Sequence, residues 1–393
     1  MRLLLLLASL SAAPDPVELD ELPAEVPRRA LAPPLATAKP LPVAELDLAA
    51  PLPDGGLGLR GERLTLDPVL QHELTDLLKS YQTPWAAVVV LEPGSGRVLA
   101  MAEHSETEPA LRSLCTRALF PAASVFKIVT AAALLEAGVS PGELSCYHGG
   151  KRKVSEELLQ DTAADGRCVT LEEALGLSAN VIFAKLTARY LDPRRLARAA
   201  KAFRFNSPLL FPLAADVSLA AIPSETAELA STGAGFGDVY MSPLHAAALV
   251  SVVANHGEWR WPVLFEKDVG SRPAEPAIDP ARAQALEDML ASTVQQGTAR
   301  HFFSQPQYRF DAVGKTGSLA DKSPVFRDYS WFAGFAPRSH PRVAVAAVVV
   351  NDPAWRIRAT WLAAEALRLA LSKRHEPKES ARLDDTVKAS VNH

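Results

Sequence analysis

The stretch DAVGKTGSLA, Asp311–Ala320, predicts a β-strand that carries a Gly-Lys-Thr-Gly core. Gly-Lys-Thr also closes phosphate-binding loops, but these need a glycine five residues before it so that backbone N–H groups wrap the phosphate. Arg309 stands at that position and disfavours nucleotide binding. On a strand, the Lys315 ammonium and the Thr316 hydroxyl instead suit a substrate carboxylate, and Gly317 lets an extended peptide approach the backbone closely.

The rest of the chain predicts an α+β fold around this strand. Apolar spacing and turn residues define the elements. In chain order we expect a helix over 66–81, a hairpin over 85–104, a buried helix over 125–138, further helices through 242–255, three antiparallel strands over 312–350 and a closing helix over 360–374. Thr170 and Glu173 have capping-box spacing at the start of one of the middle helices.

A Ser-x-x-Lys motif opens the buried helix. Ser124 and Lys127 lie one helical turn apart on the same face. A lysine can take the proton of a serine nucleophile if its pKa falls from about 10.4 to roughly 7–8. The apolar surroundings and a second positive charge, for which Lys315 is the candidate, both lower the pKa of an amine. A helix cap followed by a snorkelling lysine is the structural alternative.

A Ser-x-Asn motif lies at the break between two predicted helices. Ser178 can relay a proton between Lys127 and a leaving group, and the Asn180 amide can orient Lys127 and a substrate amide. Ordinary helix caps are the structural alternative. The backbone N–H groups of Ser124 and Ser318 are the candidates for an oxyanion hole.

These three motifs, in this order, resemble the transpeptidase domain of penicillin-binding proteins, and the similarity covers residues 60–373. The resemblance implies the penicillin-binding/β-lactamase-like fold, an antiparallel five-stranded sheet flanked by helices plus an all-helical lobe. It also implies a peptidoglycan D,D-transpeptidase that forms a serine acyl-enzyme with D-Ala-D-Ala stem peptides and is inhibited by β-lactams. The implied catalytic residues are Ser124, Lys127, Ser178, Asn180 and Lys315, and the implied substrate-binding residues are Thr316, Gly317 and Ser318.

The sequence departs from the usual family pattern in two places. PAASVFK replaces Pro-Gly-Ser before the nucleophile, and SPLH, which ends at His245, replaces Thr-Pro-Leu-Gln; we expect both to alter the rim of the site. A D,D-carboxypeptidase and a β-lactamase remain alternatives, although the Glu-x-x-x-Asn of class A and the Ser-x-Val of class D β-lactamases are missing. A non-catalytic β-lactam sensor is the alternative of another class.

The two ends of the chain predict export and a spacer. Residues 1–13, MRLLLLLASLSAA, have the charge, apolar run and small residues of a signal peptide, and the run is shorter than the roughly 20 residues of a membrane span. Residues 14–57 hold about a third of the 31 prolines and predict an extended or disordered linker that is available to cell-wall synthesis partners. We expect a transpeptidase domain over 58–373, a polar tail over 374–393, and a soluble protein in the periplasm or outside the cytoplasmic membrane.

Composition and cysteine spacing narrow the remaining function classes. A net charge of −4 without a long basic run does not favour nucleic-acid binding. The cysteines and histidines are scattered without metal-ligand spacing, so we predict neither a metal site nor a cofactor. The glycines of STGAGFGDVY follow no predicted strand and indicate a turn. Cys146 and Cys168 either form a disulfide or, with Cys115, are buried thiols.

Overall fold

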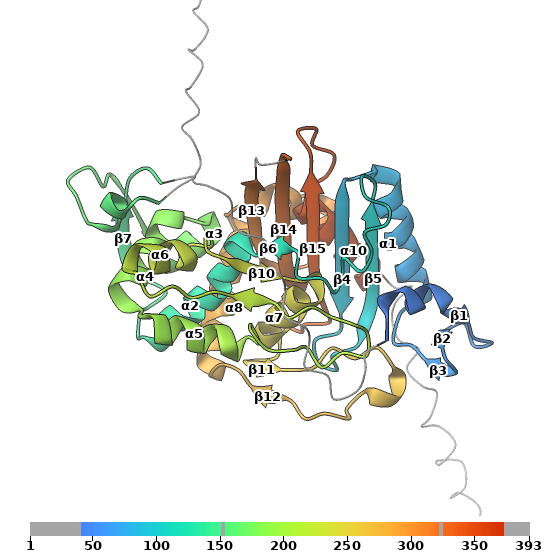
Figure 1. Cartoon of the computed structure of the whole chain (residues 1–393). Coiled ribbons are helices and arrows are strands. Elements are labelled where there is room, and N and C mark those ends of the chain that lie inside the picture. The colour runs from blue at the N-terminus through green and yellow to red at the C-terminus, as the bar shows by residue number, and fades with distance from the viewer. Residues whose placement is uncertain (1–40, 151–153, 322–324, 373–393) are drawn as a thin grey trace, which may run out of the picture. The chain divides into compact units, whose positions relative to one another are not determined.

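A five-stranded antiparallel sheet carries the Lys-Thr-Gly stretch, in the strand order β13-β14-β15-β4-β5 (Figure 1). The computed structural model describes residues 41–150, 154–321 and 325–372. The sheet is made of β13 (Val313–Asp321), β14 (Arg327–Ala336), β15 (Val343–Asn351), β4 (Trp85–Leu91) and β5 (Val98–Ser105). The predicted hairpin and the three C-terminal strands are therefore present. In the described part of the chain, β13 is an edge strand that pairs only with β14.

Strand β15 shows why the sheet is buried on both faces. All nine of its residues are buried. Because side chains alternate across a strand, Ala346 and Val348 join one apolar cluster, whereas Val345 and Val349 join the other. Helices α1 (Pro68–Tyr81) and α10 (Ala359–Leu371) cover the second face, and α7 (Pro243–Ala254) packs on the first.

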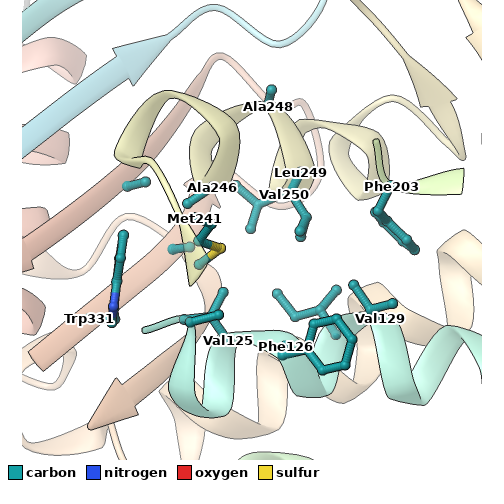
Figure 2. Packing of buried hydrophobic residues seen from close by; sticks show 14 of the residues in the cluster. Val125, Phe126, Val129, Phe203, Met241, Ala246, Ala248, Leu249, Val250 and Trp331 are labelled. Atoms are coloured by element: carbon teal, nitrogen blue, oxygen red, sulfur yellow. The ribbon is translucent and has the colours of Figure 1, made fainter. Parts of the chain in front are cut away.

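An all-helical lobe lies beside β13 in Figure 1. It comprises α2 (Lys127–Glu136), α3 (Leu171–Leu177), α4 (Asn180–Tyr190), α5 (Pro193–Ala202) and α6 (Thr226–Gly233), with α8 (Pro280–Gln295) and the short α9 (Arg300–Phe303) leading to the sheet. Helix α2 is the predicted buried helix and contacts α4, α5 and α8. Figure 2 shows Phe126, directly before α2, and Val129 of α2 facing Phe203 and the α7 side chains Leu249 and Val250.

Short strands and 3₁₀ turns complete the described chain. The small sheets are β1 (Ala50–Pro51) with β2 (Leu57–Leu59) and β3 (Glu62–Arg63), β6 (Phe120–Pro121) with β10 (Val239–Met241) and β9 (Leu219–Ala220), β11 (Glu258–Trp259) with β12 (Glu275–Pro276), and β7 (Leu144–Tyr147) with β8 (Arg167–Thr170). The 3₁₀ turns are Val43–Leu48, Ala123–Phe126, Glu156–Leu159, Glu266–Asp268 and Pro306–Tyr308.

The predicted linker is partly structured. Leu41 exchanges backbone hydrogen bonds with the 212–214 segment, and Val43 and Leu46 pack against the core. These contacts with the fold begin N-terminal to the boundary that the sequence predicts at residue 57. These apolar residues are partly buried by contacts distant in sequence, which the proline-rich composition does not indicate.

The expected signal peptide, the linker up to residue 40 and the whole polar tail lie outside the described residues. In the described chain, no helix combines the length and the apolar character that crossing a membrane requires.

A disulfide between Cys146 and Cys168 joins β7 to β8, while Cys115 is a buried free thiol. The structure thus decides between the alternatives left open by the sequence. The hairpin also accepts a hydrogen bond from the buried Lys185 of α4, whose Nζ lies 3.0 Å from the Cys146 carbonyl oxygen and 2.6 Å from Asp165. The hydrogen bonds from Lys185 and from His148 hold the pKa of the Asp165 carboxyl well below its usual range.

We expect the double variant Cys146→Ser/Cys168→Ser to lose stability. Opening a disulfide whose cysteines are 22 residues apart restores chain entropy to the unfolded state, which corresponds to about 3 kcal/mol. Urea unfolding under oxidising conditions measures the loss. Reductant should destabilise the wild type similarly and leave the double variant unaffected; equal midpoints for both proteins would contradict the expectation.

His245 is not at the rim of the site, in contrast to the sequence expectation. It lies inside α7, fully buried, and its Nε2 lies 2.7 Å from the carbonyl oxygen of Phe203. Nε2 therefore carries the proton, and among the described residues Nδ1 has no hydrogen-bond partner. Burial lowers the pKa of His245 to about 4.

We expect acid to destabilise the fold through His245. The unfolded imidazole has a pKa near 6.5 and the folded one near 4, so the unfolded state binds more protons between these values. Stability should therefore fall as the pH drops from about 6.5 to 4, by at most about 3 kcal/mol from this group. Thermal unfolding of His245→Gln beside the wild type tests this: a pH dependence of equal size in both proteins would refute it.

Candidate active site

Ser124 lies in the 3₁₀ turn Ala123–Phe126, immediately before α2. Two hydrogen bonds fix the chain ahead of it: Trp331 Nε1 donates to the Pro121 carbonyl at 2.9 Å, and the Ala122 N–H donates to the Val239 carbonyl at 2.8 Å. Ala123 has φ = 46°, a left-handed conformation that disfavours any residue with a Cβ and that glycine adopts freely. The departure from Pro-Gly-Ser thus places a strained alanine directly before Ser124.

The Lys127 side chain is fully buried, and its amine contacts three neutral groups. Nζ lies 2.8 Å from Ser124 Oγ and 2.8 Å from Asn180 Oδ1, and it also donates to the Ala234 carbonyl. A neutral amine has two N–H groups and one lone pair, and carbonyl oxygens can only accept. If Asn180 and Ala234 take the two N–H groups, the lone pair is left for the Ser124 hydroxyl.

The environment of Lys127 favours this neutral form. Burial is the larger cause and the charge of Lys315 the second, and together they lower the pKa of Lys127 well below its ordinary value. Both causes are those expected from the sequence. The Nζ–Oγ distance is within the range for proton transfer between a general base and its nucleophile.

The Lys-Thr-Gly strand lies against the nucleophile turn. Lys315 is fully buried, its Nζ donates to the Thr316 carbonyl at 2.9 Å, and burial lowers its pKa to about 7. A Cβ on Gly317 would lie 3.2 Å from Val125 Cγ2 and 3.4 Å from the Ala122 carbonyl oxygen. Gly317 therefore allows β13 to pack closely on the turn, which is a structural role beyond the expected approach of a substrate.

The Ser-x-Asn motif occupies the predicted helix break. Ser178 caps the C-terminus of α3 in a left-handed conformation, with φ = 56°, and Asn180 begins α4. The expected capping box of Thr170 and Glu173 starts α3. Of the predicted site residues, Ser124, Lys127 and Asn180 are joined by hydrogen bonds. In the described chain, no hydrogen bond links the side chains of Ser178 or of the exposed Ser318 to this group.

Two groups at the site were missed by the sequence analysis. The Ala234 carbonyl binds Lys127, and Gly235 has φ = 92°. A Cβ at Gly235 would lie 2.5 Å from the Ala123 oxygen and 3.1 Å from Ser124 N, so only glycine fits behind the turn that carries Ser124. The glycine cluster of STGAGFGDVY was the available signal, which we interpreted only as a turn. The described residues hold no cluster of three or more His, Cys, Asp or Glu side chains suited to a metal ion.

Comparison with known proteins agrees with this geometry. The family model for the penicillin binding protein transpeptidase domain matches residues 86–367. The peptidoglycan D,D-transpeptidase PbpA of Mycolicibacterium smegmatis is 28% identical over 316 residues, which are 70% of this chain and 63% of that protein. Stage V sporulation protein D of Bacillus subtilis is 27% identical over 76% of this chain and 50% of that protein. The chain thus spans less than two thirds of the length of either relative.

A solved structure confirms the fold predicted from the resemblance. The D,D-transpeptidase domain of a peptidoglycan glycosyltransferase from Eggerthella lenta superposes with a TM-score of 0.65 and 26% identity, covering 84% of this chain and 89% of that one. Penicillin-binding protein A from Mycobacterium tuberculosis, at 24% identity and a TM-score of 0.61, shares the fold. By its motifs, its fold and the family match, the chain belongs to the penicillin-binding protein transpeptidase domain family.

Proposed function

We propose that the protein is a peptidoglycan D,D-transpeptidase that acts on D-Ala-D-Ala stem peptides through an acyl-enzyme on Ser124. The observation that carries the proposal is the buried Lys127 amine, 2.8 Å from Ser124 Oγ, with two carbonyl oxygens in position to take its N–H groups. This is the arrangement of a nucleophile with its general base. The name of the relative PbpA, peptidoglycan D,D-transpeptidase, supports the same activity.

The chemistry consists of two acyl transfers. Lys127 accepts the Ser124 proton while Oγ attacks the carbonyl of the penultimate D-Ala, forming a tetrahedral intermediate. Its collapse breaks the amide bond, and the terminal D-Ala leaves as an amine after receiving a proton from Lys127, relayed by Ser178. An acceptor amine then attacks the ester and gives up a proton to Lys127; as the ester bond breaks, the amide cross-link forms and Lys127 returns the proton to Ser124 Oγ. The N–H groups of Ser124 and Ser318 are proposed to stabilise the oxyanion in both steps.

Strand β13 is proposed to bind the substrate. It has one unpaired edge in the described chain, and an extended peptide can add to such an edge through backbone hydrogen bonds. Lys315 and Thr316 supply an ammonium and a hydroxyl for the terminal carboxylate of D-Ala-D-Ala. A β-lactam carries a reactive amide and a carboxylate in a similar relation, so it should acylate the same serine.

We further propose that the enzyme works outside the cytoplasm. The Cys146–Cys168 disulfide supports this location, because such bonds persist in oxidising compartments. The proposed substrate points to the same location, because stem peptides are cross-linked in the cell wall. The expected signal peptide fits this location, and the N-terminal linker remains our candidate for contact with cell-wall synthesis partners.

We expect Ser124 to carry a lasting covalent adduct after exposure to a fluorescent penicillin. Lys127 activates the serine, and the sequence shows no β-lactamase motif for a deacylating water. Mass spectrometry of tryptic peptides should place the adduct on Ser124, and Ser124→Ala should abolish it. Labelling that persists in Ser124→Ala would refute the assignment of Ser124 as the acylated nucleophile.

The same assay separates the related activities. Rapid hydrolysis of penicillin without a lasting adduct would indicate a β-lactamase. Release of D-Ala from a D-Ala-D-Ala peptide without transfer to an added amine would indicate a carboxypeptidase. A stable adduct without any peptide turnover would indicate a sensor.

Lys315→Ala should weaken acylation and change its pH profile. Loss of a charge-assisted bond to the carboxylate should slow acylation roughly 10- to 100-fold. Without the neighbouring charge the pKa of Lys127 rises, so the acidic limb of the profile should move to higher pH. In the wild type, the rate should also fall as the pH rises through about 7, where Lys315 loses its charge.

The control is a penicillin methyl ester, which has no carboxylate. With this ester the fall in the acylation rate near pH 7 should disappear. Lys315→Ala should then slow acylation only slightly through lost recognition, because there is no carboxylate to recognise. A wild-type rate and an unmoved profile for Lys315→Ala with the free acid would show that Lys-Thr-Gly is not the recognition strand.

A further inference from the structure

Thr298 lies in the connection between α8 and α9, outside the three sequence motifs, and its side chain is exposed. Its Oγ1 lies 2.5 Å from Oγ1 of Thr316 in the Lys-Thr-Gly strand. Its backbone N–H donates to the Gly176 carbonyl at 3.1 Å, and its Oγ1 lies 3.4 Å from the same oxygen. Because Gly176 is two residues before Ser178, Thr298 connects the end of α3, directly before the Ser-x-Asn motif, to the recognition strand.

Close packing holds Thr298 in this position. A Cβ on Gly297 would lie 2.1 Å from the Gly176 oxygen, and a Cβ on Gly176 would lie 2.6 Å from Ser292 Oγ. The end of α3 and the end of α8 therefore meet at two glycines. The backbone bond from Thr298 to Gly176 is independent of the Thr298 side chain, so the position of residue 298 should survive loss of its hydroxyl.

The two threonine hydroxyls can share their hydrogen bond in two ways. If Thr316 donates to Thr298, the Thr316 proton is not available to a ligand. If Thr298 donates to Thr316, the Thr316 proton is free and its oxygen is polarised, which strengthens it as a donor. A carboxylate can only accept, so a bound carboxylate selects the second arrangement. The Gly176 carbonyl competes weakly for the Thr298 proton because it is 0.9 Å farther away, at 3.4 Å instead of 2.5 Å.

We propose that Thr298 is a positioning residue for carboxylate recognition: its hydroxyl donates to Thr316 Oγ1 and thereby directs the Thr316 proton to the terminal carboxylate of the substrate or β-lactam. The inference rests on the proposed function. Thr298 acts through Thr316 and takes no part in the proton transfers of Ser124 and Lys127.

The test is a double-mutant cycle on the second-order rate of acylation by a fluorescent penicillin. Thr298→Val keeps the shape and removes the hydroxyl, and it should slow acylation roughly 5- to 30-fold, the effect of one lost hydrogen bond. Thr298→Ser should restore most of the rate. In a Thr316→Val background, Thr298→Val should have little further effect, because its acceptor is already missing.

Two further readouts separate positioning from a general structural effect. With a D-Ala-D-Ala peptide, Thr298→Val should raise KM more than it lowers kcat, and the acidic limb of the pH profile should not move. The matched control is Thr293→Val on α8, whose hydroxyl is buried and has no hydrogen-bond partner among the described residues. This variant should acylate at the wild-type rate.

The outcomes that overturn the inference are distinct from those that overturn the function. A wild-type rate for Thr298→Val, full additivity with Thr316→Val, or an equal loss in Thr298→Ser would each refute the positioning role while the wild type still labels on Ser124. Failure of the wild type to label on Ser124 would refute the proposed function, and the role of Thr298 would fall with it.

Discussion

The desolvation of the Lys127 amine is the constraint on which the site depends. A buried ammonium without a counter-charge is costly, and the contacts of this amine in the described chain are to a hydroxyl and two carbonyl oxygens. Lys315 adds a second buried amine that further disfavours the charge on Lys127. The fold therefore disfavours the charged form of the Lys127 amine beside Ser124, and no carboxylate of the described residues forms a hydrogen bond with it.

Lys185 is also a buried lysine, but its amine is paired with carboxylates. Its side chain is as deeply buried as that of Lys127, but its amine lies 2.6 Å from Asp165 and 3.2 Å from Asp161. These carboxylates compensate its charge, so Lys185 ties α4 to the disulfide hairpin. The same helix begins with Asn180, which orients Lys127. Helix α4 thus bears an ion cluster at its middle and, at its start, the hydrogen bond from Lys127 to Asn180, so the two buried lysines differ in their partners.

Rigid packing maintains the geometry around Ser124. The turn that carries it is held from the sheet by Trp331, from β10 by Val239 and from behind by the backbone of Gly235. These supports place a left-handed alanine, Ala123, before the nucleophile and compensate its strain. Such over-determined backbone is typical of active sites, where a fixed nucleophile costs less reorganisation during the reaction.

The sequence by itself determined the local arrangements. The one-turn spacing of Ser124 and Lys127, the helix break at Ser178 and the strand around Lys315 follow from rules that span only a few residues, and the order of the motifs indicated the family. Two features depend on contacts distant in sequence: part of the proline-rich 41–57 segment packs against the core, and His245, which the departure from Thr-Pro-Leu-Gln led us to expect at the rim of the site, is buried in α7.

Only the tertiary structure decided which groups meet across the site. The Ala234 carbonyl and Lys127 are hydrogen-bonded although they are 107 residues apart, and Thr298 and Gly176 are hydrogen-bonded although they are 122 residues apart. The pairing of Cys146 with Cys168 follows from the pairing of β7 with β8. A backbone carbonyl has no sequence signature, and a single threonine has no periodicity. Their roles arise because packing of the helical lobe against the sheet excludes water and fixes these groups at hydrogen-bond distance, which no local pattern encodes.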